Sequence, residues 1–264
     1  MNKASARKRI IGIDLARALA VIGMIIVNFK LVVGDEGVPW LQRTVSILDG
    51  KAAATFVVLA GVGLAFTTNT ALRNKDEVKL RVVRKKIIKR AGFLFIVGLS
   101  YLLIWPADIL HFYGVYMLII LLLLRSRASI ILLVSLALIA IYPLLMMLWP
   151  YETGWDFEAL KYEGFWTLSG FMRNLFFNGF HPVIPWVSFM LVGYWLGKQD
   201  LRNDRVVKKI FWISFGAFVA IQGLSYGAII GLAAGNPQVA QELTEIIGTS
   251  PMPPLPMYML NGIT

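Results

Sequence analysis

The distribution of apolar residues along the chain predicts a bundle of membrane-spanning helices. Seven apolar stretches, each bounded by charged residues, proline or glycine, approach the length needed to cross a hydrocarbon core of roughly 30 Å. They lie at residues 10–30, 52–69, 87–105, 109–124, 129–149, 183–197 and 206–234. We therefore expect an all-α, polytopic transmembrane helix bundle of about seven spans, in which residues 1–264 form a single transmembrane domain.

The composition excludes an ordinary soluble domain. Of the 264 residues, 58% are hydrophobic and 16% are charged, and the mean hydropathy is +0.69. Soluble domains carry about 25% charged residues. The chain has no cysteine, which excludes disulfide bonds and sulfur-ligated metals, and it contains neither a Walker loop nor an HExxH motif. We expect no metal and no tightly bound cofactor.

The basic residues alternate between successive connections of the predicted bundle. Twenty of the 26 Lys and Arg residues lie in the N-terminal segment or in the second, fourth and sixth connections, whereas five lie in the other connections. Basic residues mark the cytoplasmic side of membrane proteins. We therefore expect a cytoplasmic N-terminus, which holds Lys3, Arg7, Lys8 and Arg9, and we expect residues 150–182 to form an extracytoplasmic loop or a re-entrant segment.

Residues 70–90 form the predicted basic cytoplasmic connection. Leu80, Val83 and Ile87 recur there at helical spacing, which predicts an amphipathic helix leading into the third span. Such a helix either lies on anionic membrane lipids or binds the phosphates of a cytosolic donor such as coenzyme A. Nucleic acid is not expected, because the helix continues into the membrane. The candidate phosphate ligands are Lys79, Arg81, Arg84, Lys85 and Lys86.

The first span contains charged residues that a membrane helix normally reserves for a function. Asp14 and Arg17 are three residues apart and share one helix face. Intramembrane charges usually face protein or water, so the pair is either a substrate site or a structural bridge at the interface. Asn28 and Asp49, at the predicted outer ends of the first two spans, are further substrate-binding candidates.

The chain has two histidines, and the predicted topology places both near the outer face. Asp108 and His111 are three residues apart at the start of a helix, so the carboxylate can orient the imidazole and raise its basicity. This pair is either catalytic, with His111 as general base or transient acyl carrier, or an interfacial feature within an aromatic belt. His181, in an aromatic and proline-rich segment, is either a substrate ligand or another interfacial residue.

Five strings, in order along the chain, resemble a known family. They are RIIGIDLARALAVIGMIIVNF, LDGKAAATFVVLAGVGLAF, DILHFYGVYMLI, IPWVSFMLVGYWLGK and PPLPMYML. Together they resemble the YeiB-like bacterial inner-membrane proteins, a family similar to the transmembrane acyltransferases typified by heparan-α-glucosaminide N-acetyltransferase. The resemblance implies a multi-pass protein of the bacterial cytoplasmic membrane. It also implies acyl-CoA as co-substrate and a lipid or sugar acceptor, extracytoplasmic or within the membrane.

One departure from this pattern concerns catalysis. Relatives with demonstrated acetyl transfer carry a histidine in the loop after the first span, and KLVVGDEGVPWLQRTVSILDGK has none. We expect His111 to take its place. Family members are longer, and PPLPMYML begins a further apolar segment, so we expect this sequence to be part of a longer protein. The alternative functions are a transporter or exporter that uses Asp14 and Arg17, and a non-catalytic immunity or partner protein.

Overall fold

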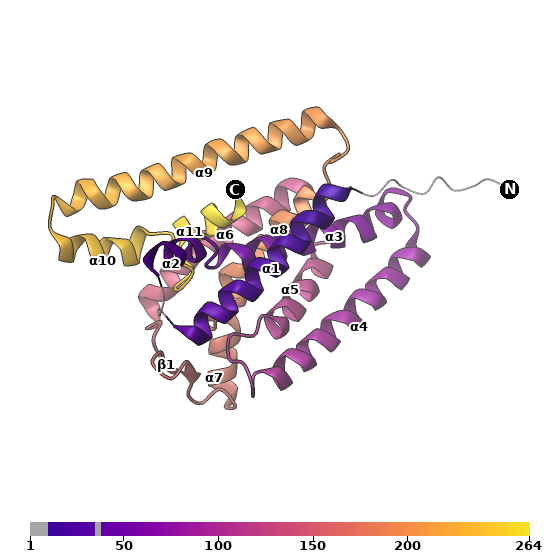
Figure 1. Cartoon of the computed structure of the whole chain (residues 1–264). Coiled ribbons are helices and arrows are strands. Elements are labelled where there is room, and N and C mark those ends of the chain that lie inside the picture. Colours follow the sequence, from indigo (N-terminus) through magenta and orange to yellow (C-terminus); the bar gives the residue numbers. More distant parts are fainter. Residues whose placement is uncertain (1–9, 35–37) are drawn as a thin grey trace.

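The computed structural model describes residues 10–34 and 38–264, and the predicted cytoplasmic cluster of Lys3, Arg7, Lys8 and Arg9 lies outside them. Nearly all of the regular structure in this part of the chain is helical, which confirms the predicted all-α bundle (Figure 1). The first helices are α1 (Ile11–Val33), α2 (Pro39–Ser46), α3 (Lys51–Arg73), α4 (Glu77–Tyr101), α5 (Leu110–Leu122) and α6 (Ala128–Leu148). They are followed by the strands β1 (Trp155–Asp156) and β2 (Lys161–Tyr162), then α7 (Leu168–Arg173), the π-helix η1 (Asn174–Asn178), α8 (Val183–Leu196), α9 (Asp204–Ala233), α10 (Pro237–Ile247) and α11 (Pro256–Ile263).

Each predicted apolar stretch coincides with a helix, but the helices differ in length. Within the described residues, four helical segments are long and apolar enough to cross a membrane: α1, α2 together with α3, α6 and α9. The segment Leu168–Asn178 and α8 are bent by 46° and make a fifth if they form one broken span. The chain is thus a multi-pass membrane protein, whereas the count of seven spans and the cytoplasmic N-terminus stay predictions.

Helices α3 and α8 form the centre of the bundle. Their backbones approach closely at Gly61 and Gly193, where an added Cβ would collide with the carbonyl oxygens of Met190 and Val58 respectively. Small residues permit this approach in membrane helices, where dispersion contacts rather than water exclusion drive association. The side chain of Tyr194 is fully buried there. The short apolar stretch at 183–197 is therefore the most enclosed helix of the bundle.

Helix α4 is continuous from the basic connection into the apolar stretch that follows it. The Asp76 carboxylate accepts a hydrogen bond from the Lys79 backbone N–H at 2.9 Å and caps the helix start. Leu80 and Ile87 are buried against the bundle, so one face of the basic segment packs on protein. Most of the basic residues of this segment lie on its other, exposed face.

The segment 150–182 contains an antiparallel hairpin, β1–β2, which is held to the approach of α8 by one buried side chain. Asn178 is fully buried, and its Nδ2 donates to the backbone oxygens of Tyr151 and Thr153 at 2.6 and 2.9 Å. Its Oδ1 accepts a hydrogen bond of 2.7 Å from the Tyr162 hydroxyl. Because His181 follows three residues later, these bonds fix the position of that histidine.

Helix α9 lies along the outside of the bundle, where α10 folds back beside it and α11 returns to the centre (Figure 1). On α11, the Tyr258 hydroxyl donates to the backbone oxygen of Gly50 at 3.1 Å. This contact places Met252, in the segment before α11, next to the start of α3.

Candidate functional site

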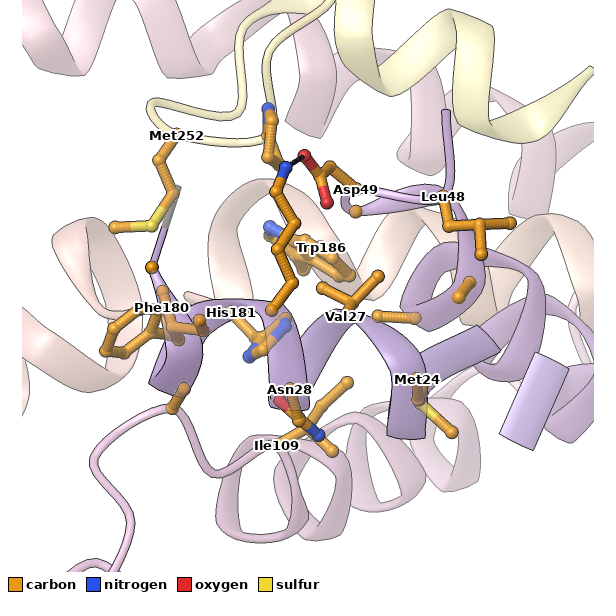
Figure 2. A pocket seen from close by; sticks show the side chains of 18 residues that line it. Met24, Val27, Asn28, Leu48, Asp49, Ile109, Phe180, His181, Trp186 and Met252 are labelled. Carbon is orange, nitrogen blue, oxygen red and sulfur yellow. Dashed lines mark hydrogen bonds and ion pairs between the residues drawn. The ribbon is translucent and has the colours of Figure 1, made fainter. Parts of the chain in front are cut away.

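A cavity of about 420 Å³ lies where α1, the start of α3 and the start of α8 meet (Figure 2). We call it the histidine pocket. Three of the residues predicted as substrate ligands converge on it, although they lie far apart in the sequence. Its walls include Met24, Val27, Asn28, Lys30, Asp49, Ile109, Phe180, His181, Trp186 and Met252.

One wall of the histidine pocket is an ion pair between α1 and the residues before α3. Lys30 Nζ and Asp49 Oδ2 are 2.6 Å apart, drawn as a dashed line in Figure 2. The two side chains are 26% and 29% exposed, so solvent weakens their attraction only in part. The pair holds the last turn of α1 against α3 and places opposite charges at the cavity.

His181 and Trp186 bring unused hydrogen-bonding capacity to the same cavity. Within the described part of the chain, His181 Nδ1 and Trp186 Nε1 are buried without a hydrogen-bond partner. Their rings are nearly perpendicular, with centroids 4.5 Å apart. The His181 backbone oxygen accepts a hydrogen bond from the Tyr116 hydroxyl, which fixes the segment. Because buried polar atoms are nearly always paired, these two atoms favour a polar ligand.

The predicted contact between Asp108 and His111 is present, but neither side chain lines the histidine pocket. His111 Nδ1 and Asp108 Oδ2 are 2.9 Å apart, and both side chains are buried. The ring centroid of Phe112 lies 3.8 Å from that of His111 and 6.2 Å from that of His181. His111 does not line the cavity, whereas Asp108 lines a separate hollow of about 340 Å³ that it shares with Asn28.

The electrostatics of Asp108 follow from its hydrogen bonds. Asp108 lies in the connection between α4 and α5, outside both helices. Burial raises the pKa of this carboxyl, but hydrogen bonds from the His111 ring and from the backbone N–H groups of Leu110 and His111 outweigh burial and hold the pKa below its ordinary value of 3.8. Asp108 is therefore a carboxylate at neutral pH and can fix the tautomer of His111.

A second cavity, of about 540 Å³, lies between α1, α3, α4 and α5. We call it the arginine pocket, because Arg17, Lys86 and Arg90 line it beside apolar side chains and Tyr113. Arg17 Nη1 also lies 3.5 Å from Asp14 Oδ1, as their spacing predicts. Three cations from two helices thus face one partly apolar cavity.

The face of α4 decides which predicted phosphate ligands reach the arginine pocket. Val83 and Ile87 line it, and Lys86 and Arg90 lie on the same helix face. The candidates that do not line it are Lys79, Arg81, Arg84 and Lys85. Sequence reasoning missed Arg90, although its spacing of four from Lys86 and three from Ile87 is the signal that could have found it.

Three further residues of the histidine pocket were not predicted. In the sequence, Lys30 is one of the charges of an outer connection, and Trp186 is part of the apolar stretch 183–197. Met252 reaches the cavity through the α11 contact with Gly50, which no local pattern encodes.

The family of this chain follows from comparison with known proteins. The model of the catalytic region of heparan-alpha-glucosaminide N-acetyltransferase matches residues 9–226. Comparison with curated proteins and with solved structures gives no match. The matched region covers most of the chain, including all of the arginine pocket and the histidine pocket as far as Trp186. The chain therefore belongs to the heparan-alpha-glucosaminide N-acetyltransferase catalytic family.

Proposed function

We propose that this protein is a transmembrane acetyltransferase that binds acyl-CoA through the arginine pocket and transfers the acyl group to an acceptor in the histidine pocket. The observation that carries the proposal is that both cavities lie along the seam between α1 and α3. One is lined by three cations, and the other holds a histidine with an unpaired ring nitrogen.

The arginine pocket suits the phosphorylated end of the donor. Guanidinium groups bind phosphates through two parallel hydrogen bonds, and Lys86 adds a further positive charge. The apolar walls at Phe56 and Met117 suit the uncharged pantetheine arm. In agreement with the predicted topology, Lys86 and Arg90 belong to the basic connection, so the donor would enter from the cytoplasm.

The two pockets are separated along α1 by about three helical turns. Arg17 and Asn28 are eleven positions apart, which at 1.5 Å per residue is roughly 16 Å. Ala20 and Gly23 are buried in between, and a Cβ on Gly23 would lie 3.0 Å from the Ala52 Cβ. Because α1 and α3 are in close contact at Gly23 and Ala52, an extended pantetheine arm would have to pass beside this contact to bring its thioester to the histidine pocket.

The chemistry in the histidine pocket needs a base and a donor to the thioester oxygen. A neutral His181 ring nitrogen would remove the proton from the acceptor amine or hydroxyl as it attacks the thioester carbon. The Asn28 amide would donate to the carbonyl oxygen as negative charge develops there. The new bond to the acceptor forms, the carbon–sulfur bond breaks, and the protonated His181 returns its proton to the coenzyme A thiolate.

His111 has a supporting role in this proposal. It is the base expected from the sequence, and within the described residues its Nε2 is also buried without a hydrogen-bond partner, but its side chain does not line the histidine pocket. Asp108 and His111 are close enough to interact electrostatically with His181. We therefore assign the proton transfer to His181 and treat His111 as a positioning residue.

The test is acetyl transfer from radiolabelled acetyl-CoA to glucosamine by the purified chain in nanodiscs. His181→Gln should lower turnover by about two to four orders of magnitude without changing the dissociation constant of acetyl-CoA. Arg17→Gln should instead weaken acetyl-CoA binding, and the exposed Lys208→Gln should change neither quantity.

Three outcomes would contradict this proposal. Full turnover in His181→Gln together with its loss in His111→Gln would return the base to His111. Failure of acetyl-CoA to bind at all would overturn the acetyltransferase assignment. Uptake of the acceptor without acetylation would support the transport alternative.

A further inference from the structure

A further hollow, of about 470 Å³, opens where three interhelix turns meet. The turns are those between α3 and α4, between α5 and α6, and between α8 and α9. We call it the cationic hollow, because Arg73, Lys75, Arg125 and Lys198 line it. None of its lining residues lines the histidine pocket or the arginine pocket.

The charge of the cationic hollow is unbalanced. Its four cations come from three separate turns, and the carboxylate of Glu77 is its one acidic group among the described residues. Glu77 is engaged by Arg125, whose Nη2 lies 2.7 and 2.6 Å from the two carboxylate oxygens. The hollow therefore keeps an excess of three positive charges, and the mutual repulsion of those charges falls when an anion binds.

Lys198 is held in place within this hollow. Its Nζ lies 4.9 Å from the centroid of the Tyr194 ring and donates to the Ser126 backbone oxygen at 3.0 Å. An ammonium group has three N–H donors, and this is the one protein acceptor found for Lys198 in the described ranges. The Asn69 amide donates to the Gly197 backbone oxygen at 2.9 Å, which fixes the turn. Two donors of a pre-positioned cation thus remain for a ligand.

The hollow combines these cations with an apolar base. Leu80 and Leu124, at 2% and 1% exposure, close it on the side of the bundle. The helix ends that surround it belong to the connections with the predicted cytoplasmic excess of Lys and Arg, and in that topology they lie at the level of the lipid headgroups. Basic pockets in such positions bind phosphate-bearing headgroups.

We propose that the cationic hollow binds a phosphate group, held by Lys198 at its centre and by Arg73, Lys75 and Arg125 at its rim. The phosphate belongs either to the headgroup of an anionic phospholipid or to a soluble phosphate ester. Binding ties the three turns together, so it stabilises the bundle independently of acetyl transfer.

Ligand titration of the purified full chain in a neutral detergent tests this site. Thermal unfolding is followed with short-chain phosphatidylglycerol, with short-chain phosphatidylcholine and with inorganic pyrophosphate. A midpoint that rises with phosphatidylglycerol alone assigns a lipid headgroup, and one that rises with pyrophosphate assigns a soluble phosphate. A midpoint that rises with neither ligand, or equally with phosphatidylcholine, overturns the proposal.

Substitutions locate the binding. Lys198→Met should raise the dissociation constant of whichever ligand binds by roughly tenfold to a hundredfold, because a hydrogen-bonded charge is lost. Lys208→Met, an exposed lysine of α9 outside the hollow, and Arg17→Gln, in the arginine pocket, should leave the affinity unchanged. If Lys198→Met does not fold, the double variant Arg73→Gln and Lys75→Gln, at two exposed positions of the hollow, provides the same test of ligand affinity. Equal weakening by Lys208→Met would show nonspecific attraction and overturn the assignment.

Discussion

Lys30 and Asp49 lie nineteen residues apart in the sequence, and their charged atoms meet at 2.6 Å across the seam between α1 and α3. The pair closes one side of the histidine pocket beside His181 and Trp186 (Figure 2). It therefore couples the position of the last turn of α1 to the shape of the cavity.

Exchange of the two charges tests this coupling. Lys30→Met or Asp49→Asn should lower the free energy of unfolding by about 1 kcal/mol or less, because the pair is partly exposed. Either change should also lower acetyl-transfer activity. The double variant with Lys30→Asp and Asp49→Lys should regain part of both losses, and Arg43→Gln on α2 serves as the control. Losses in the double variant equal to the sum of the single losses would show that the pair does not act as a unit.

The contact between α3 and α8 is expected to tolerate no added methyl group. Gly193→Ala should lower the free energy of unfolding in detergent by roughly 1–3 kcal/mol or more, and the thermal midpoint with it, because its Cβ would meet the Val58 carbonyl and not a flexible side chain. Gly216→Ala, on α9, has open space around the new Cβ and should be neutral or stabilising by up to about 1 kcal/mol. Similar midpoints for the two variants would argue against close packing of α3 on α8.

The hairpin between β1 and β2 is expected to depend on Asn178. Asn178→Ala removes two donated hydrogen bonds and one accepted hydrogen bond, and it leaves backbone oxygens unpaired at a buried position. We expect a loss of about 2–4 kcal/mol and faster amide hydrogen exchange throughout residues 151–163. Ser169→Ala, at an exposed position of α7, is the matched control. Unchanged exchange in the hairpin would mean that other contacts hold it.

The fold was predictable from the sequence because its helices are long and apolar. The predicted stretch 206–234 became α9, and 129–149 became α6, each within a few residues. Spacing of three residues also predicted the contacts between Asp14 and Arg17, within α1, and between Asp108 and His111, where the carboxylate precedes the first turn of α5, since such contacts are local in the sequence.

The composition of the pockets was less predictable, because it depends on long-range packing. The sequence leaves His181 as either a substrate ligand or an interfacial residue and favours His111 as the base, yet His181 lines the cavity with Asn28 and Asp49, whereas His111 does not. The position of His181 depends on the bend before α8, which has no periodic signal in the sequence. The four cations of the cationic hollow are likewise scattered over three turns, so no single window of sequence reveals them.

A pH dependence is expected from Asp108. Its pKa in the folded protein is lower than its ordinary value of 3.8, so the carboxylate stabilises the fold fully above that value and loses this contribution as the pH falls through the lowered pKa. Asp108→Asn should therefore be less stable than the unsubstituted protein at pH 6, and the difference between their thermal midpoints should narrow towards pH 3. A constant difference would show that the charge of Asp108 does not contribute.

The contribution of Met252 to the histidine pocket has a consequence for biosynthesis. Asn28, Lys30 and Asp49 leave the ribosome about 200 residues before Met252, an interval of roughly 10–40 s at 5–20 residues per second. During that interval the residues of the Lys30–Asp49 wall have been synthesised and the segment that carries Met252 has not. A nascent chain can thus acquire its cations and carboxylates early, but it encloses a ligand only after the segment before α11 has been synthesised and has docked on Gly50.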